Sequence, residues 1–419
     1  MDDDRKVRAR RLFLAQSLAV SGSAALGSAA LAGESMDNLP PNIPHWMKRE
    51  GHALTWHDYT LPSKFEKHVV RSVTNQRMPG SGSMRTPLQH LRGMMTPNGV
   101  VFERSHAGVP EINPAEHRLM IHGLVKRPML FTMDDLVRFP SVSRIYFLEC
   151  SGNTSVQWRK PVAKSIQLTH GLLSCCEWTG VLLSTVLQEV GLEPGAKWVL
   201  AEGADAAAMT RSIPVDKCLE DAMLVYGQNG EMLRPQQGYP LRLFLPGFEG
   251  NMSVKWLRRL KVGTAPFMTR EETSMYTDVM PDGTARQFTY MMEAKSVITY
   301  PCVDHRLSSG RGFYEISGLA WTGMGRVKRV DISTDGGRSW AEAQLQEPVL
   351  HRAVTRFRFP WNWDGKEATI QSRVVDETGY VQPTQAQLIA QRGLNSRYHN
   401  NAIQSWRILV SGEVINVHA

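Results

Sequence analysis

Cysteine is scarce in this chain, with five residues in 419. So low and odd a number excludes a fold built on a disulfide framework and leaves at least one thiol free. The sequence has no Cys-x-x-Cys-His motif for haem attachment, and no pair of Cys-x-x-Cys motifs for a zinc or iron–sulfur site. We therefore expect no haem in this chain.

Lysine-rich runs with interleaved aromatic residues are also missing, although the formal net charge is +8. The first 32 residues contribute five basic and three acidic side chains, so the remainder is still basic. Such a surplus attracts nucleic acid, anionic lipid or small anions, or is an ordinary solvated surface. Because the aromatic–basic pattern is missing, we expect no nucleic-acid partner. A chain of this length is too long for one core, which predicts two domains.

The first 32 residues indicate an export signal. Arg10-Arg11-Leu12-Phe13-Leu14 precedes a stretch rich in Ala, Leu, Ser and Gly that ends at Ala30-Leu31-Ala32. These are the charged, apolar and cleavage parts of a signal peptide, and the paired arginines resemble a twin-arginine signal. Gly and Ser interrupt the apolar part, so no membrane span is expected after processing. The alternative is an N-terminal amphipathic helix. The resemblance to a twin-arginine signal implies export of a folded protein to the periplasm.

Composition divides the remaining residues into three parts. Residues 33–92 are rich in Pro, Gly, Ser and Met and show little periodicity, which predicts an extended N-terminal arm. Residues 93–285 mix strand and helix patterns and are expected to form a domain of their own. Residues 286–419 carry short strands with tight turns, which indicates an immunoglobulin-like β-sandwich. The expected fold class is α+β, with a mixed α/β domain followed by the sandwich.

Local patterns predict individual elements. Thr132 followed by Asp135 resembles a capping box before a short helix. A helix is expected over residues 184–190, ended by Gly191. The predicted strands cover residues 144–148, 241–245, 254–262 and 368–375, and a predicted hairpin covers 327–340 around Asp335-Gly336-Gly337.

The predicted strand over residues 144–148 leads into Cys150-Ser151-Gly152-Asn153. A turn at a strand end presents side chains to a pocket, and a thiolate there suits a soft or high-valent metal. Taken alone, Cys150 is better explained as a small buried hydrophobe. We expect the other four cysteines, Cys175, Cys176, Cys218 and Cys302, to be packing residues.

Segments around Cys150 carry the motif order of one enzyme family. They are Phe102-Glu103-Arg104-Ser105-His106, Cys150-Ser151-Gly152-Asn153, Glu202-Gly203-Ala204-Asp205, Gly238-Tyr239-Pro240-Leu241-Arg242, Ser253-Val254-Lys255-Trp256-Leu257, Ala320-Trp321-Thr322-Gly323 and Asp335-Gly336-Gly337. In order and spacing, from about residue 101 to the C-terminus, they resemble the sulfite oxidase family of molybdopterin enzymes. The resemblance implies a molybdopterin-binding domain of the sulfite oxidase fold and a C-terminal dimerisation domain.

The resemblance further implies molybdopterin as the cofactor and Cys150 as the protein ligand of molybdenum. The pterin and its phosphate need cationic and polar partners. The matching positions hold Phe102, Arg104, His106, Asp205, Gln237, Arg242, Ser253, Val254 and Lys255. Gln237 departs from the family, because many members have a histidine there.

On the substrate side, the resemblance adds catalytic residues that surround the sulfur oxyanion. They are Arg104, Trp178, Tyr276 and Arg392, besides Cys150. An arginine fork binds an oxyanion bidentately, and Tyr276 could relay a proton. Core packing is the alternative for Trp178 and Tyr276.

Ser155 is the main departure, because sulfite oxidases place an arginine five residues after the metal cysteine. A less cationic pocket suits a larger or neutral sulfur substrate. Together with the segment 169–181, this makes the chain similar to the molybdenum subunit of sulfane dehydrogenase in the periplasmic thiosulfate-oxidising system. That resemblance implies oxidation of sulfane sulfur on a sulfur-carrier protein, a separate c-type cytochrome as electron acceptor, and assembly as a homodimer or heterotetramer.

Three other functions remain open at this stage. The first is a direct sulfite:cytochrome c dehydrogenase. The second is an exported molybdenum reductase acting on sulfoxides. The third, from another class, is a cofactor-free binding module with an immunoglobulin-like domain.

Overall fold

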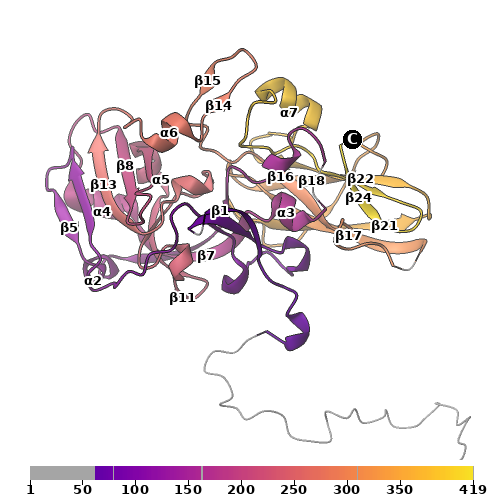
Figure 1. The fold of residues 1–419 in the computed structure, drawn as a ribbon, viewed down its shortest axis with the longest axis horizontal. Coiled ribbons are helices and arrows are strands. Elements are labelled where there is room, and N and C mark those ends of the chain that lie inside the picture. The colour runs from indigo at the N-terminus through magenta and orange to yellow at the C-terminus, as the bar shows by residue number, and fades with distance from the viewer. Residues whose placement is uncertain (1–61, 79, 162–163, 309, 419) are drawn as a thin grey trace, which may run out of the picture. The chain divides into compact units, whose positions relative to one another are not determined.

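The computed structural model describes residues 62–78, 80–161, 164–308 and 310–418. The predicted signal peptide and the first half of the predicted arm lie outside these residues. Within them, no helix is both long and apolar enough to cross a membrane. Two groups of strands, β5, β8 and β13 in one and β17, β18, β21, β22 and β24 in the other, lie on opposite sides of Figure 1.

The first group belongs to a mixed α/β domain with two five-stranded sheets. One sheet runs β11 (Glu231–Met232), β10 (Met223–Gln228), β7 (Leu173–Leu182) and β6 (Ser141–Glu149), with β12 (Arg242–Phe244) paired to β10. The other runs β5 (Met129–Phe131), β4 (Leu119–Gly123), β13 (Leu257–Gly263), β8 (Trp198–Gly203) and β9 (Thr210–Pro214). Only β4 and β13 pair in parallel in this second sheet.

Short helices connect and cover these strands. They are α2 (Met133–Val137), α3 (Ile166–His170), α4 (Leu183–Val190), α5 (Val215–Glu220) and α6 (Arg270–Ser274). The capping box is confirmed, because Thr132 and Asp135 exchange side-chain-to-backbone hydrogen bonds at the start of α2. The helix before Gly191 is confirmed as α4, which buries Leu183, Val186, Leu187 and Val190 on one side.

The C-terminal region is a two-sheet β-sandwich, as predicted. One sheet runs β16 (Lys295–Tyr300), β17 (Gly312–Trp321), β21 (Thr355–Trp363) and β20 (Gln344–Leu345). The other runs β19 (Ala341–Glu342), β18 (Val327–Ser333), β22 (Ala368–Asp376), β23 (Ser405–Ile408) and β24 (Val414–Val417). Trp321, Phe357 and Trp406 are fully buried in the core of the sandwich. Helix α7 (Gln385–Arg392) lies between β22 and β23 in the sequence.

Two element boundaries differ from the sequence expectation. The strand expected from Val254 begins only at Leu257, because Trp256 has a positive φ of 52° and turns the chain. In the 327–340 hairpin the returning strand begins at Ala341, because the Asp335 carboxylate accepts the backbone N–H groups of Arg338 and Ser339 and lengthens the turn. The predicted domain boundary at 285/286 lies inside a short hairpin, β14 (Asp278–Val279) and β15 (Ala285–Arg286), which precedes β16.

The described part of the arm contains two strands that the sequence analysis did not anticipate. Strands β1 (Ser72–Met78) and β2 (Ser81–Arg85) join β3 (Glu103–Ser105) in a three-stranded antiparallel sheet. Ser83 pairs with Arg104 across β2 and β3. The arm therefore supports the strand that carries the Phe102–His106 motif.

Candidate active site

Cys150 follows the last residue of β6, and its turn is held by hydrogen bonds to neighbouring segments. Its backbone N–H donates to Leu172 O at 3.0 Å. The side-chain amide of Asn153 donates to Glu149 Oε1 at 2.9 Å and to His170 O at 3.0 Å, and its Oδ1 accepts from Leu172 N at 3.1 Å. The asparagine of the cysteine motif thus fixes where the thiol points.

The β-sandwich supports the same turn from behind. Lys295 Nζ lies 2.9 Å from Glu149 Oε1 and 2.9 Å from Thr154 Oγ1, and Trp321 Nε1 donates to Glu149 Oε2 at 2.6 Å. Glu149 and Lys295 are buried. The sandwich therefore contributes directly to the position of Cys150.

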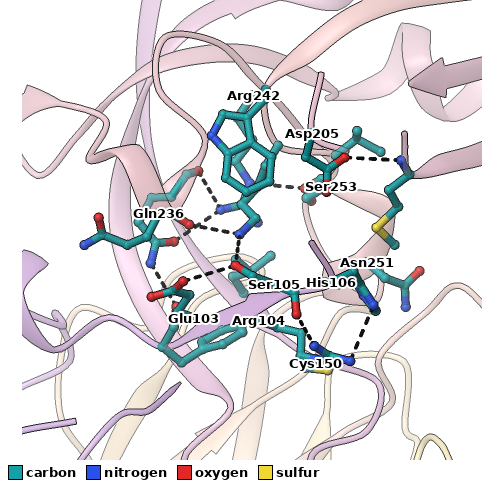
Figure 2. Close-up of a pocket in the computed structure, with 18 of the residues that line it drawn as sticks. Glu103, Arg104, Ser105, His106, Cys150, Asp205, Gln236, Arg242, Asn251 and Ser253 are labelled. Carbon is teal, nitrogen blue, oxygen red and sulfur yellow. Dashed lines mark hydrogen bonds between the residues drawn. The ribbon is translucent and has the colours of Figure 1, made fainter. Parts of the chain in front are cut away.

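A pocket opens in front of Cys150. Eleven of the predicted site residues line it: Phe102, Arg104, His106, Cys150, Asp205, Gln237, Arg242, Ser253, Val254, Lys255 and Tyr276. Figure 2 shows Arg242 and Cys150 at opposite ends of the view, with Ser105 between them. Residues 170 positions apart in the sequence, such as His106 and Tyr276, therefore face one space.

The far end of the pocket carries two cations without a carboxylate partner. Arg242 is buried and donates to Gln237 O and Ser253 O at 3.1 and 3.2 Å, and Lys255 Nζ donates to Gln236 O at 3.0 Å. Burial lowers the pKa of Arg242 to about 9; burial, with Arg242 as the next cause, lowers the pKa of Lys255 to about 7. Among the described residues neither cation forms an ion pair, so an anion entering this end would be attracted to both.

Gly238 lets these two cations approach each other. Its φ is +111°, and a Cβ there would meet the Cβ atoms of Lys255 and Arg242 at 3.1 and 3.2 Å. Any larger residue would therefore be strained and would push the cations apart.

The Gln237 side chain points into the protein. Its N–H donates to Phe102 O at 2.9 Å and its Oε1 lies 3.4 Å from Arg242 Nη1. Its amide thus holds the walls of the pocket.

Near Cys150 the pocket contains an arginine, a histidine and a tyrosine. Arg104 Nη2 lies 3.4 Å from His106 Nδ1, and Tyr276 Oη lies 3.5 Å from His106 Nε2. Burial, followed by the charges of Arg104 and Lys255, lowers the pKa of His106 to about 4, so the imidazole is neutral near pH 7. Arginine only donates, so Nδ1 accepts and the proton lies on Nε2, facing Tyr276.

Burial raises the pKa of Tyr276, so its hydroxyl stays protonated. Its φ of +44° is an uncommon conformation for a bulky residue. Such strained positions concentrate at functional sites. The arrangement presents a protonated phenol and a guanidinium on one side of the space in front of Cys150.

A buried ion network that the sequence analysis did not predict lies under Tyr276. The Arg211 guanidinium is 4.8 Å from the centre of the Tyr276 ring. Its Nε lies 3.2 Å from Glu272 Oε1 and its Nη2 lies 3.1 Å from Glu249 Oε1. Glu249 Oε2 is in turn 3.2 Å from His399 Nε2, and the backbone N–H of His399 donates to Ser151 O.

Two predicted catalytic residues do not line the pocket, which corrects their expected placement. Trp178 is fully buried on β7, where its ring packs at a tilt against Phe244 with ring centres 4.5 Å apart and lies 5.5 Å from the Arg242 guanidinium. It therefore supports Arg242 from below. Arg392, at the end of α7, is fully buried and bound to Glu293 at 3.0 Å and Asp278 at 3.7 Å, so it holds the β14–β15 hairpin to the sandwich.

Other pocket residues were not predicted. They are Glu103, Ser105, Leu148, Met209, Gln236, Gly250, Asn251 and Trp256. Most are direct neighbours of motif residues, and that adjacency was the available signal. Ser155 begins a 3-10 turn (Ser155–Gln157) and does not line the pocket. Cys175, Cys176, Cys218 and Cys302 are buried free thiols, and burial raises the pKa of each.

The pocket fits an anionic cofactor that brings its own metal ligands. Burial raises the pKa of the Cys150 thiol, and a bound metal would favour the thiolate. Among the described residues no group of three His, Cys, Asp or Glu side chains could hold a metal ion. A metal at Cys150 would therefore need ligands from the cofactor, while Arg242 and Lys255 would meet its negative charge.

Comparisons with known proteins agree with this chemistry. A family described as "Oxidoreductase molybdopterin binding domain" matches residues 106–271, and a "Mo-co oxidoreductase dimerisation domain" matches residues 286–406. The chain is 31% identical to the sulfite oxidase of Gallus gallus, over 69% of this chain and 68% of that protein. It is 30% identical to a nitrate reductase [NADH] of Solanum lycopersicum, over 82% of this chain but 41% of that protein.

A solved structure is also similar over the whole of its length. The sulfane dehydrogenase SoxCD of Paracoccus pantotrophus matches with 47% identity and a TM-score of 0.89, covering 92% of this chain and all of that chain. Fold and pocket define a molybdopterin-binding oxidoreductase. The chain belongs to the sulfite oxidase family of molybdenum enzymes, and within that family it resembles the SoxC-like molybdenum subunits.

Proposed function

We propose that this chain is the molybdenum subunit of a sulfane dehydrogenase, which oxidises sulfane sulfur bound to a carrier protein. The observation that carries the proposal is the 47% identity to a sulfane dehydrogenase chain across all of that chain's length. The curated relatives are more distant, and the chain spans 41% and 61% of the tomato nitrate reductase and the rat sulfite oxidase.

The pocket residues suit distinct tasks in such an enzyme. Cys150 would bind molybdenum, and Arg242 and Lys255 would neutralise the phosphate of the pterin. When bound, the cofactor supplies two-electron oxidation of sulfur. The Arg104 guanidinium orients a negatively charged sulfur group, and the neutral His106 holds its Nε2 proton toward Tyr276. Tyr276, protonated at neutral pH, donates a hydrogen bond to an oxygen near Cys150.

The absence of an arginine at position 155 supports the carrier-bound substrate. Arg104 is the arginine that lines the pocket beside Cys150, and the segment after Cys150 contributes none. A doubly charged free sulfite would gain from a second guanidinium, whereas a sulfur held by a protein gains affinity from contacts outside the pocket.

The deciding experiment is cytochrome c reduction by the purified holoenzyme with two substrates side by side. A thiosulfate-loaded sulfur-carrier protein should be turned over well and free sulfite poorly. Robust sulfite oxidation without any carrier would reject the proposal and favour a direct sulfite:cytochrome c dehydrogenase, the second candidate, which the Arg104 guanidinium at the pocket supports. Under that second candidate, Ser155→Arg leaves sulfite turnover unchanged or improved.

Cofactor binding has its own test, which is independent of the substrate. Cys150→Ser should lose molybdenum, measured by elemental analysis, together with activity. Cys218→Ser is the matched control, since this buried thiol does not line the pocket and its loss should leave the metal content unchanged. Normal metal content and activity in Cys150→Ser would reject Cys150 as the ligand.

We further propose export through the twin-arginine route to the periplasm and electron transfer to a separate c-type cytochrome. The Arg10-Arg11 pair and the lack of a haem-attachment motif support these two points. Replacing both arginines by lysine should leave the protein in the cytoplasmic fraction; unchanged periplasmic protein would contradict the route. We also propose that the sandwich domain mediates assembly, which mass measurement by light scattering in solution tests directly.

A further inference from the structure

A second cavity, of about 380 Å³, lies on the outer side of the β16–β17–β21–β20 sheet. Its floor is a row of residues paired across three strands, Tyr300, Ser317 and Arg358. Ile316, which precedes Ser317, and Phe357, which precedes Arg358, point into the sandwich core and are fully buried. The cavity is therefore built on a rigid sheet.

The segment between Gln89 and Gly93 forms the opposite wall, and Arg356 ties it to the sheet. Arg356 Nε donates to Gly93 O at 3.0 Å, and its Nη2 donates to Leu91 O at 3.1 Å. Its side chain lines the cavity although the residue is only 5% exposed. None of the described residues accepts a hydrogen bond from the remaining nitrogen, Nη1, which is left for a ligand.

The cavity holds more positive than negative charge. Three guanidinium groups line it, those of Arg92, Arg356 and Arg358, against the single carboxylate of Glu315. That carboxylate is already bound by Arg358 at 3.0 Å. Burial, followed by the charges of Arg358 and Arg92, lowers the pKa of Arg356 to about 10. Like charges so placed repel one another unless an anion lies among them.

A nearby cavity shows that this imbalance is not a general property of the sandwich surface. That cavity is lined by three basic residues, Arg338, Lys366 and Arg407, and by three acidic ones, Asp335, Asp364 and Glu367. Its charges cancel, and Lys366 is paired with Asp364 at 3.4 Å. It provides a matched control on the same domain.

We propose that the cavity formed by Arg92, Arg356, Arg358 and His305 binds a small divalent tetrahedral oxyanion, sulfate or phosphate. Guanidinium groups recognise such ions through paired, charge-assisted hydrogen bonds. Tyr300 and Ser317 line the same space, and their hydroxyl groups would add neutral donors. The bound ion would link the segment before the Phe102–His106 motif to the sandwich sheet.

Isothermal titration of the holoenzyme with sodium sulfate and with sodium phosphate, at constant ionic strength in chloride, tests this site. The holoenzyme is used because its cofactor occupies the cation pair Arg242 and Lys255. Both titrations, or one of them, should give saturable binding, and the tighter ion identifies the ligand. Acetate, which is planar and monovalent, should bind at least about tenfold more weakly.

Arg92→Gln and Arg358→Gln should each weaken binding at least about tenfold, which corresponds to one lost charge-assisted hydrogen bond. Both side chains are partly exposed, so the fold should be retained. Arg407→Gln, in the charge-balanced cavity, should leave affinity unchanged. No saturable binding, acetate binding as tight as sulfate, or equal weakening in the Arg407 variant would each overturn the proposal.

Discussion

Two arginines on the catalytic domain are both buried yet have opposite surroundings. Arg211 lies between two carboxylates, Glu249 and Glu272, at 3.1 and 3.2 Å. In the described part of the chain, Arg242 donates hydrogen bonds only to carbonyl oxygens and has no carboxylate partner. Taking a guanidinium out of water is costly, and Arg211 recovers much of that cost inside the protein. Arg242 does not recover this cost, because it has no carboxylate partner, and its positive charge is therefore available to a ligand.

The comparison separates cations that hold the fold from cations that bind the cofactor. Lys295, paired with Glu149 at 2.9 Å, belongs with Arg211, whereas Lys255 belongs with Arg242. Arg242 and Lys255 line the pocket, whereas Arg211 and Lys295 do not. Arg211 supports the Tyr276 ring, and Lys295 supports the turn after β6.

The largest effect is expected for Arg211→Met. Removing this cation leaves Glu249 and Glu272 buried without their partner, which should cost about 3–5 kcal/mol of unfolding free energy. Chemical denaturation of the cofactor-free protein measures it. Arg211→Lys retains the charge and should lose less. A loss below about 1 kcal/mol for Arg211→Met would remove the distinction between the two arginines.

Arg242→Met should show the reverse pattern. The cofactor-free protein should lose less than half the stability that Arg211→Met loses, because the variant also removes an unpaired buried charge. Cofactor retention should fall about 10- to 100-fold, the equivalent of one charge-assisted hydrogen-bond contact. Pterin fluorescence and molybdenum per chain measure retention. Full retention would show that Arg242 does not bind the cofactor.

Sequence patterns predicted the cations that face the cofactor and missed the buried ion network around Arg211. Arg242 and Lys255 lie in contiguous motifs of the family, so their order and spacing identified them, and both line the pocket. Arg211, Glu249, Glu272 and His399 come from separate segments, and only folding brings them together. A single sequence carries no local pattern for a network of this kind.

Trp178 and Arg392 show a related weakness of prediction from sequence motifs. Their motif neighbourhoods matched, but which face of a strand or helix meets the pocket depends on packing between elements. β7 turns Trp178 toward Phe244, and the end of α7 turns Arg392 toward Glu293 and Asp278. The sandwich itself was predictable, because its turns and alternating strands are local features.

The pH dependence of the unfolding free energy should show which cations lack a carboxylate partner, and Lys255 is the one to test. Burial and Arg242 lower the pKa of Lys255 to about 7 in the folded chain, against 10.5 when unfolded. Between these values the unfolded state binds more protons, so the stability of the cofactor-free protein should rise with pH. From pH 7 to 9 the gain should be about 2 kcal/mol.

Lys255→Met isolates that contribution, since the variant has no amine to titrate. The difference in slope between wild type and variant should vanish when the cofactor is bound, because its negative charge restores protonation of the amine. Equal slopes for the cofactor-free wild type and variant would contradict the lowered pKa of Lys255.

Surface ion pairs set the lower end of the comparison. Arg258 Nε lies 2.7 Å from Glu202 Oε1, closer than either carboxylate lies to Arg211, yet the Arg258 side chain is 55% exposed. Water and salt screen the exposed Arg258 guanidinium, and the buried Glu202 carboxylate keeps Arg259 as its second partner. Arg258→Met should therefore cost less than about 1 kcal/mol. This loss should shrink further in high salt, whereas the loss for Arg211→Met should hardly change. If high salt reduced both losses by the same fraction, burial would not be what makes the longer Arg211 pairs more stabilising than the shorter Arg258 pair.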